Sequence, residues 1–373
     1  MHTAFRTMIG REYPIVAFSH CRDVVAAVSR AGGLGVLGAS RYTPEELEAE
    51  LDWLDREAGD AGYGLDFLLP ARFDTDPPPP DELPVEHREF VDTLLERYEV
   101  PELTDWQRAE VVAEQEKRRT MVSAAREMWE LAAGRPIRLY ASALGAPPPE
   151  FVAAAHERGA IIGGLAGSVR HAERQKAAGV DFVVAAGTEA GGHCGEIATM
   201  VLTPDVVDVM GSTPVLAAGG IGTGRQMAAA LALGAQGVWT GSIWLSTREA
   251  ETHPVVLDKM LRAGAGDAVR SRASTGKFAR QLRSAWTDEW ADPAGPEPLG
   301  MPDQFRLIAE AKARIDRSAH RSPGAEKLVN YYVGQLVGRM TRTTTVREVV
   351  EGFVHEYVEA VERLGSISGL DPG

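Results

Sequence analysis

The chain has 373 residues, of which 44% are hydrophobic and 25% are charged. These proportions are typical of a globular protein and exclude a disordered or fibrous chain. The formal net charge is −14, and an acidic balance of this size disfavours binding to nucleic acid or to anionic lipid. We therefore predict no nucleic-acid partner.

The small number of cysteines and the absence of long apolar runs indicate in which cellular compartment the protein works. The two cysteines, Cys21 and Cys194, are too few for a disulfide framework and lack the spacing of a zinc site. The N-terminus has no apolar core of a signal peptide, and no run of about 20 apolar residues suggests a membrane span. We expect a cytoplasmic protein with neither a metal site nor a membrane partner.

Short apolar runs alternate with amphipathic segments from residue 14 onward. A strand is predicted at 14–18, a helix at 22–30 and a second strand at 34–38. Thr43 is a good N-cap, Pro44 suits the first helical position and Glu46 completes a capping box, so another helix begins there. The same alternation predicts strands at 63–69, 137–143, 160–165, 181–185, 214–218 and 237–240, and helices at 149–158, 169–178, 204–210 and 224–233.

The number of strand and helix units defines the fold class. Strands that are apolar on both faces and joined by helices indicate a parallel sheet covered by helices. Eight such units favour a closed TIM (β/α)8 barrel over an open sheet. We therefore predict an α/β protein, a TIM barrel with a smaller, mainly helical region inserted into it or appended to it.

Two segments interrupt the alternation and set the expected domain boundaries. The first, 72–133, contains a proline run at 77–80 and then a charged helical stretch, which we interpret as a lid or an oligomer arm. The barrel would comprise 1–71 and 134–251. Residues 252–324 would form a second small helical domain, and 325–373 would be C-terminal helices that pack on the barrel. Apolar positions in the last segment also suit the seam of a homodimer.

A glycine-rich segment with one histidine follows the predicted strand at 181–185. The segment Gly187-Thr188-Glu189-Ala190-Gly191-Gly192-His193-Cys194-Gly195 would lie at the active-site face of a barrel, where the strands end. Glycine lets the backbone approach a ligand closely, and histidine is the side chain best suited to proton transfer near neutral pH. An isolated segment of this kind is more often a structural turn, but its place after a barrel strand makes His193 our candidate catalytic residue.

Two further glycine loops follow the last two predicted strands. Residues 218–224 read AGGIGTG, and residues 240–242 read TGS. Backbone N–H groups of such loops bind phosphate, and the loops after strands seven and eight commonly form the phosphate site of a TIM barrel. The pair of loops indicates a phosphorylated ligand, and FMN suits a barrel better than a dinucleotide does.

These motifs together resemble the nitronate monooxygenase (2-nitropropane dioxygenase) family and the related flavin-type enoyl-acyl-carrier-protein reductases. The matching segments are AAVSRAGGLGVLG near the start, EAGGHCGE in the middle and AAGGIGTGRQMAAALALGAQGVWTGS afterwards. Weaker matches follow at 274–280 and 332–335. The resemblance implies an FMN-containing TIM barrel that acts on a small molecule.

The resemblance also implies roles for individual residues. His193 corresponds to the family's active-site histidine. The residues that would surround the flavin or hold its phosphate are Ala17, Phe18, Asp66, Gly187, Gly191, Gly192, Gly219, Gly220, Gly241 and Ser242.

Asp66 departs from the family pattern, which usually has asparagine at this position. A carboxylate near the flavin would oppose negative charge on the reduced cofactor unless it were protonated or paired. His20 and Cys21 are additional polar candidates at the first strand, and Cys194 stands beside His193; the sequence assigns none of these three a role.

Three functions compete on these observations. The first is oxidation of alkyl nitronates with dioxygen, in which His193 donates a hydrogen bond to the substrate or shuttles a proton. The second is NAD(P)H-dependent reduction of an α,β-unsaturated acyl thioester. The third is binding of a phosphorylated ligand without catalysis, since a fold alone does not determine function.

Overall fold

The barrel predicted from the sequence is present in the computed structural model, which describes residues 1–69, 82–143 and 145–369, with the backbone alone at 117–125. The proline run at 77–80 lies outside this part. Parallel strands close into a barrel in the order β1-β2-β3-β4-β5-β6-β8-β9, and β9 pairs with β1 to complete it. Their bounds are β1 (Ile15–Ser19), β2 (Leu34–Gly38), β3 (Tyr63–Phe67), β4 (Ile137–Ser142), β5 (Ile161–Ala166), β6 (Phe182–Ala186), β8 (Val215–Ala218) and β9 (Gly237–Thr240).

Side chains fill the barrel interior and close one of its ends. Val16, Leu139 and Phe182 belong to a single buried cluster that also includes Phe5 and Ile9 of α1 (Ala4–Ile9). The rings of Phe5 and Phe182 lie 5.6 Å apart. Because Phe182 begins its strand, α1 covers the end where the strands start. Only the opposite end, where the strands finish, is left for chemistry.

Helices cover the outside of the barrel, and their caps explain where they begin. Thr43 and Glu46 form the predicted capping box. The predicted start of a helix at 204 is wrong, because this helix begins at Thr199. The carboxylate of Glu189, from a separate loop, accepts the Thr199 N–H and so satisfies the first turn. The helices around the barrel are α2 (Arg22–Arg30), α3 (Pro44–Ala58), α6 (Pro149–Glu157), α7 (Val169–Ala177), α8 (Thr199–Met210) and α9 (Gly224–Ala232).

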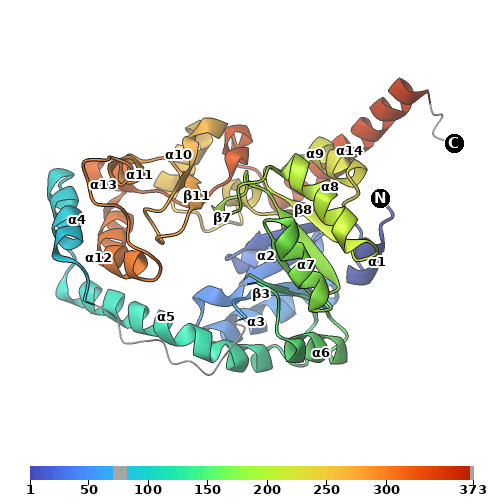
Figure 1. Cartoon of the computed structure of the whole chain (residues 1–373), viewed down its shortest axis with the longest axis horizontal. Helices are drawn as coiled ribbons and strands as arrows, with labels where there is room; N and C mark the ends of the chain where they lie inside the picture. The colour runs from blue at the N-terminus through green and yellow to red at the C-terminus, as the bar shows by residue number, and fades with distance from the viewer. Residues whose placement is uncertain (70–81, 144, 370–373) are drawn as a thin grey trace.

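The segment inserted after β3 contains α4 (Val85–Arg97) and α5 (Asp105–Leu131). Near its end, α5 packs Trp129 against Tyr140 of the barrel, with ring centroids 4.3 Å apart. Near its start, Arg108 forms an ion pair at 3.0 Å with Glu310 of α12 (Asp303–Ser318). Helix α5 therefore bridges the barrel and a second region (Figure 1); a lid or oligomer function for the segment stays a prediction.

The second region has its own hydrophobic core. Trp286, Ile308 and Ile315 pack there with Leu94 of α4. The region also contains a small sheet, in the order β10-β11-β7, that the sequence analysis did not predict. Its strands are short and carry polar residues such as Arg280, so they lack the long apolar run of a barrel strand. Its elements are α10 (Pro254–Arg262), β10 (Ala268–Ser271), β11 (Ala279–Leu282), α11 (Ala285–Glu289), α12 and α13 (Pro323–Leu328), and β7 (Gly192–His193) comes from the barrel.

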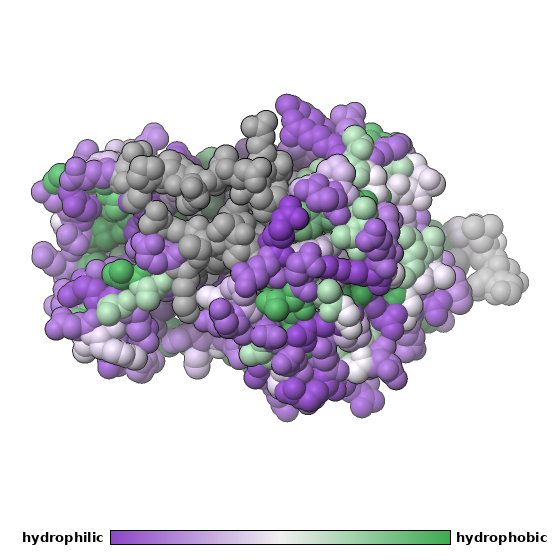
Figure 2. Space-filling view, turned by 90° about the horizontal axis from the view of Figure 1, so that it is seen from below, coloured by the Kyte–Doolittle hydropathy of each residue, from purple (hydrophilic) through white to green (hydrophobic). Residues whose placement is uncertain are grey.

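The last helix, α14 (Val346–Ser368), packs directly on α9. A side chain at Gly224, the first residue of α9, would lie 2.1 Å from the carbonyl oxygen of Phe353. Glycine therefore allows the two backbones to approach. Within the described residues, no helix is long and apolar enough to cross a membrane. The face shown in Figure 2 is mainly hydrophilic with small apolar spots.

Candidate active site

The loop after β6 carries His193 and is fixed at several points. The carboxylate of Glu189 accepts hydrogen bonds from the N–H and the hydroxyl of Thr199, at 3.0 and 2.7 Å. A carboxylate at the start of α8 is also favoured by the helix dipole. Arg280 of β11 is buried, and its Nε donates to the carbonyl of Thr188 at 2.7 Å. The loop is thus held from both the barrel and the second region.

His193 lies in β7, where it pairs with Ala279 of β11. Its Nε2 is 2.9 Å from the hydroxyl oxygen of Thr275, and that hydroxyl is 3.1 Å from the carbonyl of Lys277. A hydroxyl has one hydrogen, so donating it to Lys277 leaves an oxygen that accepts from His193. The proton of the neutral ring is therefore on Nε2, and Nδ1 is the unprotonated nitrogen. Among the described residues, Nδ1 has no hydrogen-bond partner.

The protonation state of His193 follows from its surroundings. The residue is exposed to solvent, yet the protein atoms packed around part of the ring lower its pKa from the ordinary value of 6.5. The positive charge of Lys277 lowers the pKa further. Both effects disfavour the imidazolium form, so the ring is mainly neutral at pH 7. A neutral ring with a free Nδ1 can accept a proton.

Asp66 lies on β3, in register with Gly38 of β2 and Ala141 of β4. Its side chain is 5% exposed, and no cation among the described residues pairs with it. Burial raises its pKa from 3.8 to about 8. The carboxyl is therefore largely protonated at pH 7, which removes the charge that an aspartate in place of asparagine would otherwise introduce.

The ends of β8 and β9 form a glycine cradle. Gly219 and Gly220 have φ angles of 105° and 69°, which L side chains rarely adopt. A side chain added at Gly241 would meet no atom within 4 Å, so space is open over this residue. The Ser242 hydroxyl accepts the N–H of Gly334 at 2.8 Å and keeps its own hydrogen to donate. A phosphate group fits such a combination of side-chain-free backbone and hydroxyl.

Two glycines of the His193 loop serve contacts within the protein. A side chain at Gly187 would lie 2.1 Å from the hydroxyl of Thr199, and one at Gly191 would lie 2.8 Å from the N–H nitrogen of Gly334. Gly192 has a φ angle of 75° and no neighbour that a side chain would meet. Close packing and backbone conformation therefore explain these three glycines without a ligand.

The first strand directs its predicted residues to opposite sides. Phe18 belongs to the barrel interior, where its ring stacks on Trp239 with centroids 6.4 Å apart. Ala17 packs outward against the helices, in the cluster that contains Val24. Only Phe18 of the pair therefore presents its side chain to the interior of the barrel.

The extra polar candidates have structural partners. The Nδ1 of His20 is 3.1 Å from the carbonyl of Gly38. Cys21 is buried, its thiol donates to the carbonyl of Glu249, and burial raises its pKa, which favours the unreactive thiol. Cys194 donates to the carbonyl of Thr188 at 3.4 Å. None of these contacts indicates a catalytic role.

Sequence reasoning missed Thr275 and the segment around Gly334. Gln335 donates its N–H to the carbonyl of Glu189 at 3.0 Å, while Gly334 donates its N–H to the Ser242 hydroxyl. This segment therefore joins the loops after β6 and β9. The weak matches at 274–280 and 332–335 were the available signal, but they lie far along the chain from the barrel motifs.

The comparison with known proteins decides the family. The model of the nitronate monooxygenase family matches residues 13–356. The chain belongs to the nitronate monooxygenase family. Members of this family are flavin-dependent oxidoreductases that act on small molecules. The protein is therefore an oxidoreductase. The hypothesis of a phosphate-binding protein without catalysis is thereby excluded.

Three similar proteins support the assignment. Rv1533 of Mycobacterium tuberculosis, which is named as a monooxygenase, is 51% identical over 99% of each chain. The nitroalkane oxidase of Streptomyces ansochromogenes is 25% identical with a TM-score of 0.76, covering 97% of this chain and 100% of that one. FabK of Thermotoga maritima is also 25% identical, with a TM-score of 0.72 and coverage of 98% and 99%.

Proposed function

We propose that the protein is an FMN-dependent monooxygenase that oxidises alkyl nitronates with dioxygen. The observation that carries this proposal is the 2.9 Å contact between His193 Nε2 and the Thr275 hydroxyl, which leaves Nδ1 without a hydrogen-bond partner among the described residues. This arrangement supports a proton shuttle over a hydrogen-bond donor, because the proton of the neutral ring is already engaged. The likeness to a nitroalkane oxidase supports a nitro compound as the substrate.

The glycine cradle would hold the FMN phosphate. Gly219, Gly220 and Gly241 would contribute backbone N–H groups, and Ser242 its hydroxyl. When bound, FMN supplies the redox chemistry by taking electrons from the substrate and passing them to dioxygen. Phe18 and the neutral Asp66 would lie beside the flavin ring.

His193 would act through Nδ1, which could take the acidic α-proton of the parent nitroalkane and so form the nitronate that is oxidised, because the nitronate itself has already lost that proton. Its low pKa keeps this nitrogen able to accept a proton near neutral pH. Thr275 would hold the ring in place, since it accepts the Nε2–H while it donates to Lys277. The Glu189–Thr199 and Arg280–Thr188 contacts would keep the loop from moving while the proton is transferred.

The first experiment combines a visible spectrum with single turnovers. The purified protein should show flavin absorption, which an alkyl nitronate bleaches without oxygen and air restores. His193→Asn should retain FMN but lose activity by about 10²–10⁴-fold, the usual contribution of a general acid or base. His171→Asn, on the exposed side of α7, is the matched control. Full activity of His193→Asn would remove the proposed proton shuttle, and a protein that binds no flavin would refute the proposal as a whole.

The likeness to FabK favours a second candidate. FabK represents the enoyl-acyl-carrier-protein reductases that the sequence also resembles, and in this function NAD(P)H would reduce the flavin before an α,β-unsaturated acyl thioester is reduced. Anaerobic addition of NADH or NADPH separates the two candidates. Rapid bleaching by either nucleotide supports the reductase, and bleaching by the nitronate alone supports the monooxygenase.

A further inference from the structure

The second half of α14 has an uncovered apolar side. Val358, Val361 and Leu364 are 46%, 43% and 47% exposed, whereas Val350 and Phe353 in the first half are buried. Figure 1 shows the end of this helix projecting from the body of the molecule beside the C-terminus. Single exposed apolar residues are common on protein surfaces. A row of them on one side of a projecting helix is typical of an interaction surface.

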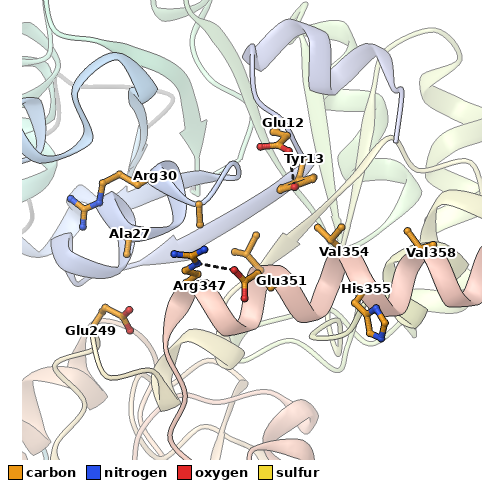
Figure 3. A pocket seen from close by; sticks show the side chains of 12 residues that line it. Glu12, Tyr13, Ala27, Arg30, Glu249, Arg347, Glu351, Val354, His355 and Val358 are labelled. Atoms are coloured by element: carbon orange, nitrogen blue, oxygen red, sulfur yellow. Dashed lines mark hydrogen bonds and ion pairs between the residues drawn. The ribbon is translucent and has the colours of Figure 1, made fainter.

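A groove lies beside the first half of the same helix. Its volume is about 790 Å³, and α14 lines one wall with Val350, Val354 and Val358. The other wall comes from α2, with Ala27, and from the residues just before β1, with Tyr13 (Figure 3). The groove therefore has apolar side chains on both walls, and its other lining residues include the charged or polar Glu12, Arg30, Glu249, Arg347, Glu351 and His355.

The polar groups of the groove already have partners. Tyr13 donates to Glu12, Arg347 pairs with Glu351, and the carboxylate of Glu249 accepts the N–H of Val346. Arg30 pairs with Glu57, and His355 with Glu359. A small polar ligand would need free groups to orient it, whereas an apolar helix face surrounded by a polar rim needs none.

The groove and the exposed row belong to one side of α14. Val350, Val354, Val358, Val361 and Leu364 follow one another at steps of four and three residues, which places them on one face of a helix. Val358 belongs to both parts. The concave part and the projecting part therefore extend in opposite directions from Val358 along the same helix.

We propose that two copies of the chain pair through α14 in an antiparallel, twofold-symmetric arrangement. The projecting half of each helix lies in the groove of the other copy, and the twofold axis passes near Val358. Val354 of each copy then faces Val361 of the other. A twofold interface requires a surface that is complementary to itself. The groove lies on one side of Val358 along the helix, and the exposed apolar row lies on the other side. Such a surface is complementary to itself, so a second copy of the chain is the partner that it fits.

The oligomeric state of the full-length, flavin-loaded protein tests this proposal. We expect sedimentation velocity to show a dimer for the native protein and a monomer for the double variant Val361→Glu and Leu364→Glu. Ser366→Glu, on the opposite side of the same turns, is the matched control and should remain a dimer. Circular dichroism should show all three folded, because the substituted residues project from the body. A native monomer, or a double variant that still dimerises, would overturn the proposal.

Cysteine cross-linking tests the direction of pairing. Val358→Cys lies near the twofold axis, so its two copies should form a disulfide under mild oxidation. Leu364→Cys should not, because its two copies would be separated by about 18 Å along the helix axis at 1.5 Å per residue. The native chain, with Cys21 and Cys194, is the control for unrelated disulfides. Cross-linking at Leu364 without cross-linking at Val358 would overturn the antiparallel arrangement.

Discussion

Replacing the buried carboxyl of Asp66 with an amide should change how the stability of the protein depends on pH. Asp66 is 5% exposed, and burial raises its pKa from 3.8 to about 8. The folded protein therefore keeps the proton over a pH range in which the unfolded chain has lost it. Asp66→Asn has nearly the same shape and cannot ionise, so it isolates this effect.

The sign and size follow from proton linkage. Below pH 3.8 both states are protonated, and Asp66 causes no pH dependence. Between 3.8 and about 8 the unfolded state binds fewer protons than the folded state, so stability falls as the pH rises, and the fall ends above about 8. The slope is about 1.4 kcal/mol per pH unit. From about pH 5.5 to about pH 7.5, the native protein should therefore lose about 2.5 kcal/mol of unfolding free energy through Asp66, a loss that Asp66→Asn does not share.

Urea unfolding at several pH values measures this difference. Both proteins are compared at the same saturating FMN concentration, after the FMN affinity of each has been determined, so that binding contributes equally. Asp66→Asn should gain stability relative to the native protein as the pH rises. If the two free energies of unfolding fall in parallel between these pH values, Asp66 is ionised in the folded protein and the reasoning from its burial is refuted.

Three further predictions concern the His193 site and the cradle. Thr275→Val should lower kcat at least about tenfold, because His193 loses the acceptor for its Nε2–H, while Thr275→Ser should restore most of it; equal activity of the two variants would contradict a positioning role. Lys277→Gln should raise the pKa of His193 and move the acidic limb of the kcat/KM profile to higher pH, because a nearby positive charge is removed. If the acidic limb stays where it is, the group that titrates there is not His193. Gly241→Ala should weaken FMN binding by about tenfold or more, equivalent to about 1.4 kcal/mol, while unfolding of the flavin-free protein changes by less than about 0.5 kcal/mol. The added methyl meets no protein atom within 4 Å, so unchanged FMN affinity in a titration would place the phosphate elsewhere.

Local sequence patterns were sufficient to predict the barrel. Each barrel strand is a short apolar run, and each turn or cap uses residues whose preference is local, such as the capping box of Thr43 and Glu46. The order of these units then defines a closed parallel barrel, because eight strand–helix units have few other ways to bury both faces of the sheet. The position of His193 after β6 follows from the same pattern.

Contacts between distant segments had to come from the tertiary structure. The helix that begins at Thr199 is capped by Glu189, and the proton of His193 is placed on Nε2 by Thr275, which is separated from it by 82 residues. No local pattern encodes such a pair, because its formation depends on how the second region packs against the barrel.

The protonation of Asp66 shows the same division between sequence and structure. The sequence identified the carboxyl and its place in a strand, but its pKa depends on burial among residues from neighbouring strands. The sequence by itself therefore determined the barrel strands, their order and the candidate groups His193 and Asp66, but neither the small β10-β11-β7 sheet nor Thr275. Only the folded protein decided which of those groups meet, which are buried and which protons they hold, because hydrogen bonding and desolvation depend on three-dimensional surroundings.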